Sequence, residues 1–151
     1  MDSADVFAIY NLMGRYAHIM DECSIAGGPW DRLGDIFTDD VEFDVRSVGG
    51  PLLSSLQQLK DAWNASVHPW GHHVTNLVVE PLGPDSAACD SKIIIILPDG
   101  RASTGVYRDR LRRTSEGWRI THRHCELRPM DLKAELPIPW RLEQRVGAAR
   151  P

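Results

Sequence analysis

The sequence has few cysteines, no long hydrophobic run and no excess of basic residues. Its three cysteines, Cys23, Cys89 and Cys125, are odd in number and lack the spacing of metal ligands, so we expect reduced thiols in a cytoplasmic protein. The longest apolar run, 93–97, suits a buried strand and is too short to cross a membrane. A formal net charge of -4 argues against a nucleic-acid partner, because such proteins present a clustered basic face.

The sequence also lacks internal repeats, low-complexity segments and a linker that would divide it. A chain of 151 residues with 42% hydrophobic and 25% charged residues is therefore predicted to form one globular domain over 1–151. Its acidic first residues do not resemble the basic leader of a secretory signal. Residues 129–151 are expected to form a C-terminal tail, because their charges and prolines give them no core of their own.

The hydrophobic pattern places helices before strands. Apolar residues at three- and four-residue steps predict a first helix over about 3–20, a short second helix near 30–37 and a third beginning near Ser54. Strands are predicted at 41–46, 71–81, 86–97, 101–113 and 117–127. This order indicates an α+β fold with helices packed on one face of a sheet.

Two histidines stand at the start of the strand predicted for 71–81. Side chains alternate along a strand, so His72 and Asn76 would share one face and His73 would lie on the other. Whichever face is covered places one histidine in the interior. A buried neutral imidazole beside a carboxylate can act as a general base, although ordinary strand packing is the alternative.

Two carboxylates, Asp21 and Glu22, follow the predicted end of the first helix. There they would face the negative end of the helix dipole, which makes a carboxylate more basic. A break in a local rule of this kind marks either a surface detail or a functional position. Asp21 is therefore a candidate proton acceptor.

Several short motifs occur in an order that is typical of one superfamily. They are Arg15-Tyr16-Ala17 running to Asp21, Ile-Phe-Thr-Asp-Asp-Val-Glu-Phe at 36–43, His72-His73-Val74-Thr75-Asn76, Gly-Val-Tyr-Arg-Asp at 105–109, and Gly117-Trp118-Arg119. Over about residues 5–128 the chain resembles the nuclear-transport-factor-2-like superfamily, and in particular its SnoaL-like branch. The resemblance implies a cone-shaped, curved antiparallel sheet with about three N-terminal helices packed on its concave face.

Within this branch the chain is similar to scytalone dehydratase, the hexachlorocyclohexane dehydrochlorinase and the bile-acid 7α-dehydratase. The resemblance implies catalysis by a His–Asp pair, His72 and Asp21, in which the acid orients the imidazole. It also implies that Tyr16 holds or protonates a leaving oxygen and that Arg123 stabilises negative charge. The chain departs from the scytalone dehydratase pattern at Val45, where that enzyme has a tyrosine, and its loop after Asp21 is longer than in the dehydrochlorinase.

The substrate is expected to lie among apolar side chains and to need no cofactor. The predicted lining residues are Met13, Met20, Phe43, Trp63, Asn76 and Ile95. His122 and His124 would lie on one strand face and could suggest a metal site together with His72. No further protein ligand is indicated at a suitable spacing, so we expect no metal.

Three functions follow as hypotheses. The first is a cofactor-independent lyase that removes water or a halide from a small hydrophobic, cyclic molecule by His72–Asp21 base catalysis. The second is an isomerase or polyketide-type cyclase in which Asp44, or the same dyad, moves a proton next to a carbonyl. His73 is the alternative base if it points inward instead of His72. The third is a non-catalytic small-ligand-binding domain, because a fold does not dictate a function.

Assembly is predicted from the second half of the chain. A strand with four consecutive isoleucines beside an arginine-striped strand suggests a sheet whose outer face is covered. We therefore expect a homodimer or homotrimer, which the resemblance also implies.

Overall fold

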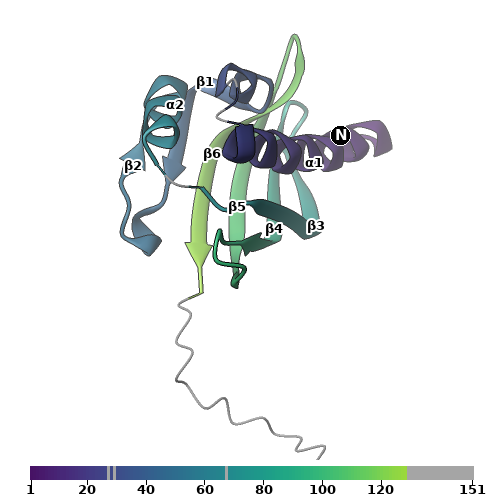
Figure 1. The fold of residues 1–151 in the computed structure, drawn as a ribbon. Coiled ribbons are helices and arrows are strands. Elements are labelled where there is room, and N and C mark those ends of the chain that lie inside the picture. Colours follow the sequence, from purple (N-terminus) through teal and green to yellow (C-terminus); the bar gives the residue numbers. More distant parts are fainter. Residues whose placement is uncertain (27, 29, 67, 129–151) are drawn as a thin grey trace, which may run out of the picture.

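The computed structural model describes residues 1–26, 28, 30–66 and 68–128 (Figure 1). Its elements in chain order are α1 (Ser3–Ala26), the 3-10 helix η1 (Trp30–Asp35), β1 (Phe37–Asp44), the 3-10 helix η2 (Arg46–Val48), β2 (Leu52–Leu53), α2 (Leu56–Asn64), β3 (Gly71–Gly83), β4 (Ser86–Ile96), β5 (Ala102–Thr114) and β6 (Gly117–Leu127). The predicted tail 129–151 lies outside the described residues. None of the helices in the described part is long and apolar enough to cross a membrane.

The strands form a six-stranded curved sheet in the order β2-β1-β6-β5-β4-β3. β3, β4, β5 and β6 pair antiparallel with their chain neighbours, as the predicted meander requires. β1, however, pairs with β6 in parallel, so the sheet is mixed rather than antiparallel throughout. No hairpin joins β1 to β6, because the two strands are far apart in sequence, and nothing local therefore imposes an antiparallel direction on them.

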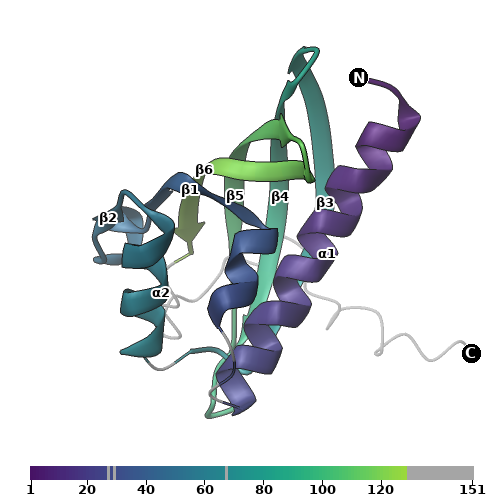
Figure 2. The ribbon, with the colours of Figure 1, turned by 90° about the horizontal axis from the view of Figure 1, so that it is seen from above.

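Both α-helices cover the same face of the sheet. α1 crosses the half that contains β3, and α2 lies beside β1 and β2 (Figures 1 and 2). The core between helices and sheet combines the apolar stripe of α1, including Ile9, Leu12 and Met13, with inward side chains of the strands. This α+β arrangement agrees with the predicted cone.

Strand β3 contains a bulge that changes which side chains face the core. Thr75 pairs with Lys92 and Val78 with Asp90, so Asn76 and Leu77 together oppose one residue of β4. Asn76 adopts a φ of 53°, in the left-handed region that asparagine tolerates better than most residues.

The bulge overturns the predicted alternation along β3. Asn76 does not share a face with His72 but is exposed, and its Oδ1 accepts a hydrogen bond from Thr75 Oγ1 at 2.9 Å. Leu77 packs against the core in its place, together with Val74 and Val79. His72 itself faces the core and is buried, whereas His73 is exposed.

Candidate functional site

Asp21 and His72 meet where the later turns of α1 pass the start of β3. Oδ1 of Asp21 lies 2.7 Å from Nδ1 of His72 and 2.8 Å from its backbone nitrogen. One carboxylate oxygen therefore accepts the backbone N–H and, in the tautomer protonated at Nδ1, the ring N–H as well. The side chain of His72 is 4% exposed and that of Asp21 is 32% exposed. The structure thus brings these two predicted residues together.

Helix α1 positions Asp21 in a way the sequence pattern did not predict. Asp21 follows the buried Met20, so its side chain leaves the border of the apolar stripe and reaches the edge strand β3. The helix does not end there but continues to Ala26, which places Asp21 more than a turn before its C-terminus. The influence of the helix dipole is concentrated in the last turn, so the group that Asp21 contacts is His72 and not the helix end.

Burial lowers the pKa of His72, and the hydrogen bond and charge of Asp21 offset part of that effect. His72 is therefore neutral at neutral pH. With Nδ1–H directed at Asp21, the lone pair is on Nε2, to which no residue in the described part of the chain is hydrogen-bonded. An oriented neutral imidazole with an unoccupied ring nitrogen has the form that a general base requires.

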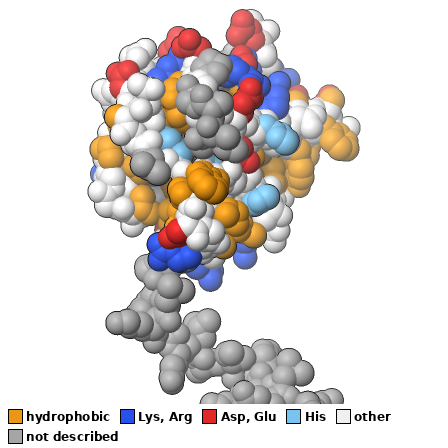
Figure 3. All heavy atoms as spheres, viewed as in Figure 1, with side chains coloured by type: hydrophobic (Ala, Val, Ile, Leu, Met, Phe, Trp, Pro, Cys, Tyr) orange, Lys and Arg blue, Asp and Glu red, His pale blue; other side chains and the backbone are white. Residues whose placement is uncertain are grey.

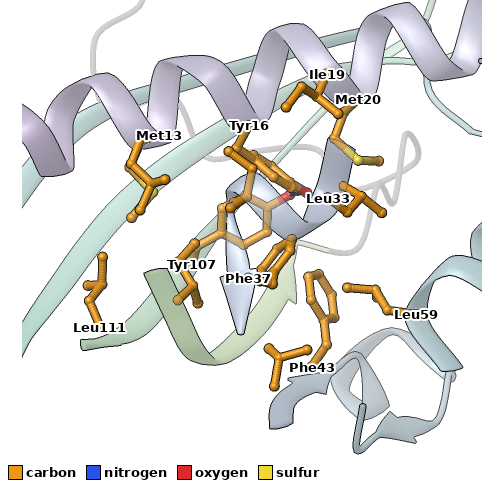
Figure 4. Close-up of a cluster of buried hydrophobic side chains, with 14 of the residues drawn as sticks. Met13, Tyr16, Ile19, Met20, Leu33, Phe37, Phe43, Leu59, Tyr107 and Leu111 are labelled. Atoms are coloured by element: carbon orange, nitrogen blue, oxygen red, sulfur yellow. Dashed lines mark hydrogen bonds between the residues drawn. The ribbon is translucent and has the colours of Figure 1, made fainter. Parts of the chain in front are cut away.

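Tyr16 connects this dyad to a second tyrosine. Its ring lies edge-on to the ring of His72, with centroids 6.4 Å apart, and to that of Tyr107, with centroids 5.8 Å apart. The hydroxyl oxygens of Tyr16 and Tyr107 are 3.2 Å apart, and Figure 4 shows them adjacent in the core. Burial raises the pKa of Tyr16 and raises that of Tyr107 strongly, so both are protonated at neutral pH.

Arg123 lies beneath the two tyrosines as a fully buried cation. Its Nε and Nη2 donate to Oδ1 and Oδ2 of Asp109 at 2.8 and 2.7 Å. Its guanidinium carbon is 4.2 Å from the ring centroid of Tyr16 and 4.1 Å from that of Tyr107. Burial by itself would lower the pKa of Arg123, but the charge and hydrogen bonds of Asp109 raise it, and the guanidinium stays charged.

Two buried polar atoms in this part of the sheet have no hydrogen-bond partner among the described residues. They are Nη1 of Arg123 and Oγ of Ser91, which stands opposite Tyr107 in the β4–β5 register. An unsatisfied buried polar group costs about 1–3 kcal/mol, so such atoms mark a place where a polar ligand atom would be stabilised.

Tyr107 and Asp109 were not predicted as site residues, although both belong to the motif at 105–109. The available signal was the alternation of β5. Arg108, Arg110 and their neighbours on one side are exposed, and the residues between them, including Tyr107 and Asp109, are buried.

The side chains predicted to line a pocket lie in different surroundings. Met13, Met20 and Phe43 are at most 2% exposed and belong to the packed core, where Figure 4 shows them around the tyrosines. Ile95, which pairs with His72 across β3 and β4, does line a groove of about 400 Å³. The other groove residues are Ser47, Val48, Leu97, Ser103, Leu127 and Arg128.

A half-buried aromatic group lies between η1, α2 and the segment before β3. Trp63, the fourth predicted lining residue, has its ring centroid 6.0 Å from those of Trp30 and His68, and Trp30 and His68 are 5.0 Å apart. On its inner side Trp63 contacts the ring of Phe43 at 5.2 Å. Figure 3, which views the helix-bearing face, shows hydrophobic side chains next to histidines on this side of the molecule.

The alternative catalytic residues Asp44 and His73 lie away from the inner face. Asp44 follows the inward-facing Phe43 and accepts hydrogen bonds from the backbone N, Nε and Nη2 of Arg46, with Nδ1 of His124 at 3.3 Å. The Arg46 side chain, its backbone N–H and His124 hold the pKa of the Asp44 carboxyl well below its usual range. A carboxylate stabilised in this way is a weak base, which argues against the isomerase hypothesis in its Asp44 form.

Each of the two histidines of β6 lies next to a carboxylate. His122 Nδ1 is 3.5 Å from Glu42, and His124 faces Asp44. Within the described ranges no group of three or more His, Cys, Asp and Glu side chains is arranged to hold a metal ion.

Comparison with known proteins places these observations in a family. A family model described as a SnoaL-like domain matches residues 1–124. No curated protein is significantly similar in sequence. Among solved structures, a proposed aromatic ring hydroxylase from Novosphingobium aromaticivorans is 28% identical, with a TM-score of 0.71 over 85% of this chain and 93% of that one.

Two further structures from Novosphingobium aromaticivorans share the fold. An NTF2-like protein with a cystatin-like fold is 20% identical, with a TM-score of 0.68 over 87% of this chain and 85% of that one. A proposed scytalone dehydratase is 19% identical, with a TM-score of 0.64 over 83% of each chain. With a family model that spans most of its length, the chain belongs to the SnoaL-like domain family, and it shares the fold of the NTF2-like structure.

Proposed function

We propose that this protein is a cofactor-independent lyase that eliminates water or a halide from a small hydrophobic, cyclic molecule. The observation that carries the proposal is the 2.7 Å contact between Asp21 Oδ1 and His72 Nδ1, which orients a buried neutral imidazole. The half-buried rings of Trp30, Trp63 and His68 favour a flat or cyclic substrate, because aromatic faces bind such molecules over a large area.

In the proposed reaction Nε2 of His72 takes a proton from a substrate carbon. The C–H electron pair forms the new double bond, and the bond from the neighbouring carbon to the leaving group breaks. Asp21 stabilises the imidazolium, and Tyr16 donates a hydrogen bond to a departing oxygen. That oxygen leaves as water after taking the proton from the imidazolium, whereas a halide leaves as the anion and the proton passes to solvent.

The dense interior favours a second candidate function, a non-catalytic small-ligand-binding domain. Met13, Met20 and Phe43, which were expected to line a substrate pocket, are buried in the hydrophobic core. A binding domain would use the groove beside Ile95 and the aromatic group without moving a proton. The two candidates therefore differ in whether His72 removes a proton from carbon.

The protein is also proposed to act as a homodimer or homotrimer. The sheet face opposite the helices carries exposed apolar side chains, with Val78 56% and Ile94 40% exposed. Acidic Glu80 and Asp90 of β3 and β4 lie in one shallow depression with the arginines Arg108 and Arg110 of β5 and the histidines of β6. A surface that holds both signs of charge can match a second copy of itself.

Kemp elimination of 5-nitrobenzisoxazole tests the proposed function without a known substrate. A base removes the C–H proton of the isoxazole ring in this flat bicyclic molecule, the C–H electron pair completes a nitrile as the N–O bond breaks, and a coloured nitrophenolate is released. We expect turnover above the buffer rate for the wild-type protein, loss of that turnover in His72→Ala, and wild-type turnover in the matched neighbour His73→Ala. Full turnover in His72→Ala, or none in the wild-type protein, would contradict a general base at this position.

A further inference from the structure

His68 lies in the segment between α2 and β3, and one hydrogen bond fixes the orientation of its ring. Its Nε2 is 2.8 Å from the backbone carbonyl oxygen of Trp63, in the last turn of α2. A carbonyl oxygen can only accept a hydrogen bond, so Nε2 carries the proton. In the neutral ring the lone pair is then on Nδ1, and no hydrogen bond to Nδ1 is formed within the described part of the chain.

Two tryptophans hold the His68 ring in place. Its centroid is 5.0 Å from that of Trp30 and 6.0 Å from that of Trp63. All three residues are only half-buried, so the group retains surface that a ligand can reach. The bond from Nε2 is explained by the helix end, since histidines near a helix C-terminus commonly donate to its last carbonyls. This bond leaves Nδ1 as an oriented, unused acceptor beside two aromatic side chains.

Ring contacts connect this aromatic group with the dyad. Trp63 and Tyr16 both contact Phe37, with centroids 6.3 and 5.9 Å apart. Tyr16 in turn contacts His72, and Figure 4 shows Tyr16 and Phe37 adjacent in the core. Burial is the main cause of the lowered pKa of His72, and a positive charge on His68 adds to it, so the two histidines are near enough to interact. One small molecule can therefore contact both.

We propose that His68 is a specificity-determining residue, whose Nδ1 accepts a hydrogen bond from a hydroxyl or N–H group of a cyclic substrate held against Trp30 and Trp63. The inference rests on the proposed function and narrows its substrate class. The substrate ring carries this donor away from the carbon that His72 deprotonates, because the two histidines contact different parts of the molecule. A ring without a donor would leave Nδ1 desolvated and unpaired, and it would bind less tightly.

Binding of 4-fluorophenol and 4-fluoroanisole, measured by fluorine NMR, tests this contact. The two probes share the ring and the oxygen, but only the phenol can donate a hydrogen bond. We expect the ratio of their dissociation constants, ether over phenol, to be about twofold to tenfold larger in the wild-type protein than in His68→Phe, which is the effect of one hydrogen bond between neutral groups. His18→Phe, the same substitution at an exposed histidine of α1, is the matched control and should keep the wild-type ratio.

The outcomes separate this inference from the proposed function. The same ratio in the wild-type protein and His68→Phe, or no binding of the phenol by the wild-type protein, would overturn the inference. If His68→Phe does not fold, nitrogen NMR of the wild-type protein replaces it: 4-fluorophenol should shift the Nδ1 resonance of His68 and 4-fluoroanisole should not, and an unshifted resonance would overturn the inference equally. His72→Ala should lose Kemp elimination while it keeps the wild-type ratio, so failure of the base and failure of the His68 contact give different results.

Discussion

Removing the carboxylate of Asp21 should have two separable effects, one on stability and one on the proton affinity of His72. Asp21→Ala leaves the backbone N–H and Nδ1–H of His72 without their acceptor. Hydrogen bonds to a charged group contribute about 1.5–3 kcal/mol each. Because the Asp21 side chain is 32% exposed and both bonds share one oxygen, solvent replaces part of this contribution. We expect Asp21→Ala to lower the free energy of unfolding by about 2 kcal/mol.

Asp21→Asn separates the charge from the hydrogen bonds. The amide oxygen can still accept from both N–H groups, so we expect the loss in stability to be no more than about 1 kcal/mol by urea denaturation. The negative charge that raises the pKa of His72 is gone, however, while the burial that lowers it remains. The pKa of His72 measured by NMR should therefore be lower in Asp21→Asn than in the wild-type protein. An unchanged or higher pKa, in a variant with a wild-type melting curve, would refute the assignment of Asp21 as the electrostatic partner.

Four other predictions follow from the same structure. The pKa of His72 is lowered in the folded state, so its contribution to stability is full above the unfolded pKa of 6.5 and should be lost as the pH falls below that value. Urea denaturation from neutral to acid pH should show this loss of stability, and the loss should be smaller in His72→Gln. Asp109→Ala leaves the buried Arg123 without its counter-ion and should lower the free energy of unfolding by about 3–5 kcal/mol. The double variant Asp109→Leu/Arg123→Met should recover much of that stability in a melting experiment. Tyr16 and Tyr107 have raised pKa values, so the ultraviolet absorbance of phenolate should increase above the pH at which free tyrosine ionises, and substitution of either by Phe should remove part of that late increase. Light scattering at micromolar concentration should give the mass of a dimer or trimer, and a monomer would contradict the proposed assembly.

The fold was within reach of the sequence because its signals are local. Helical periodicity before a meander of strands predicted the layers, and the order of short motifs identified the superfamily. The parallel pairing of β1 with β6 is not a local signal, since it depends on how the crossover through α2 carries the chain across the sheet.

The candidate site was predicted less evenly, for physical reasons that differ between residues. Asp21 and His72 lie together as the resemblance implied. The shared face of His72 and Asn76 was wrong, because one inserted residue in β3 inverts the alternation, and no simple pattern marks such a bulge. The predicted end of α1 near residue 20 was also wrong, since the helix continues to Ala26.

Side-chain packing limited the rest. Whether Met13 and Phe43 line a space or fill it depends on a few ångströms of separation between α1 and the sheet, which periodicity does not determine. Tyr107 belongs to the site only because it contacts Tyr16 of α1 and Arg123 of β6. These contacts depend on the tertiary structure, which local sequence patterns do not show.

The most direct test of the central claim is the tautomer of His72 at neutral pH, measured by long-range proton–nitrogen NMR of the wild-type protein. The proposed base requires a neutral ring that is protonated at Nδ1, where it donates to Asp21, and unprotonated at Nε2. We predict a nitrogen shift typical of a protonated, pyrrole-like Nδ1 and one typical of an unprotonated, pyridine-like Nε2. A ring protonated at Nε2, or at both nitrogens, would leave no lone pair facing the substrate and would contradict the account.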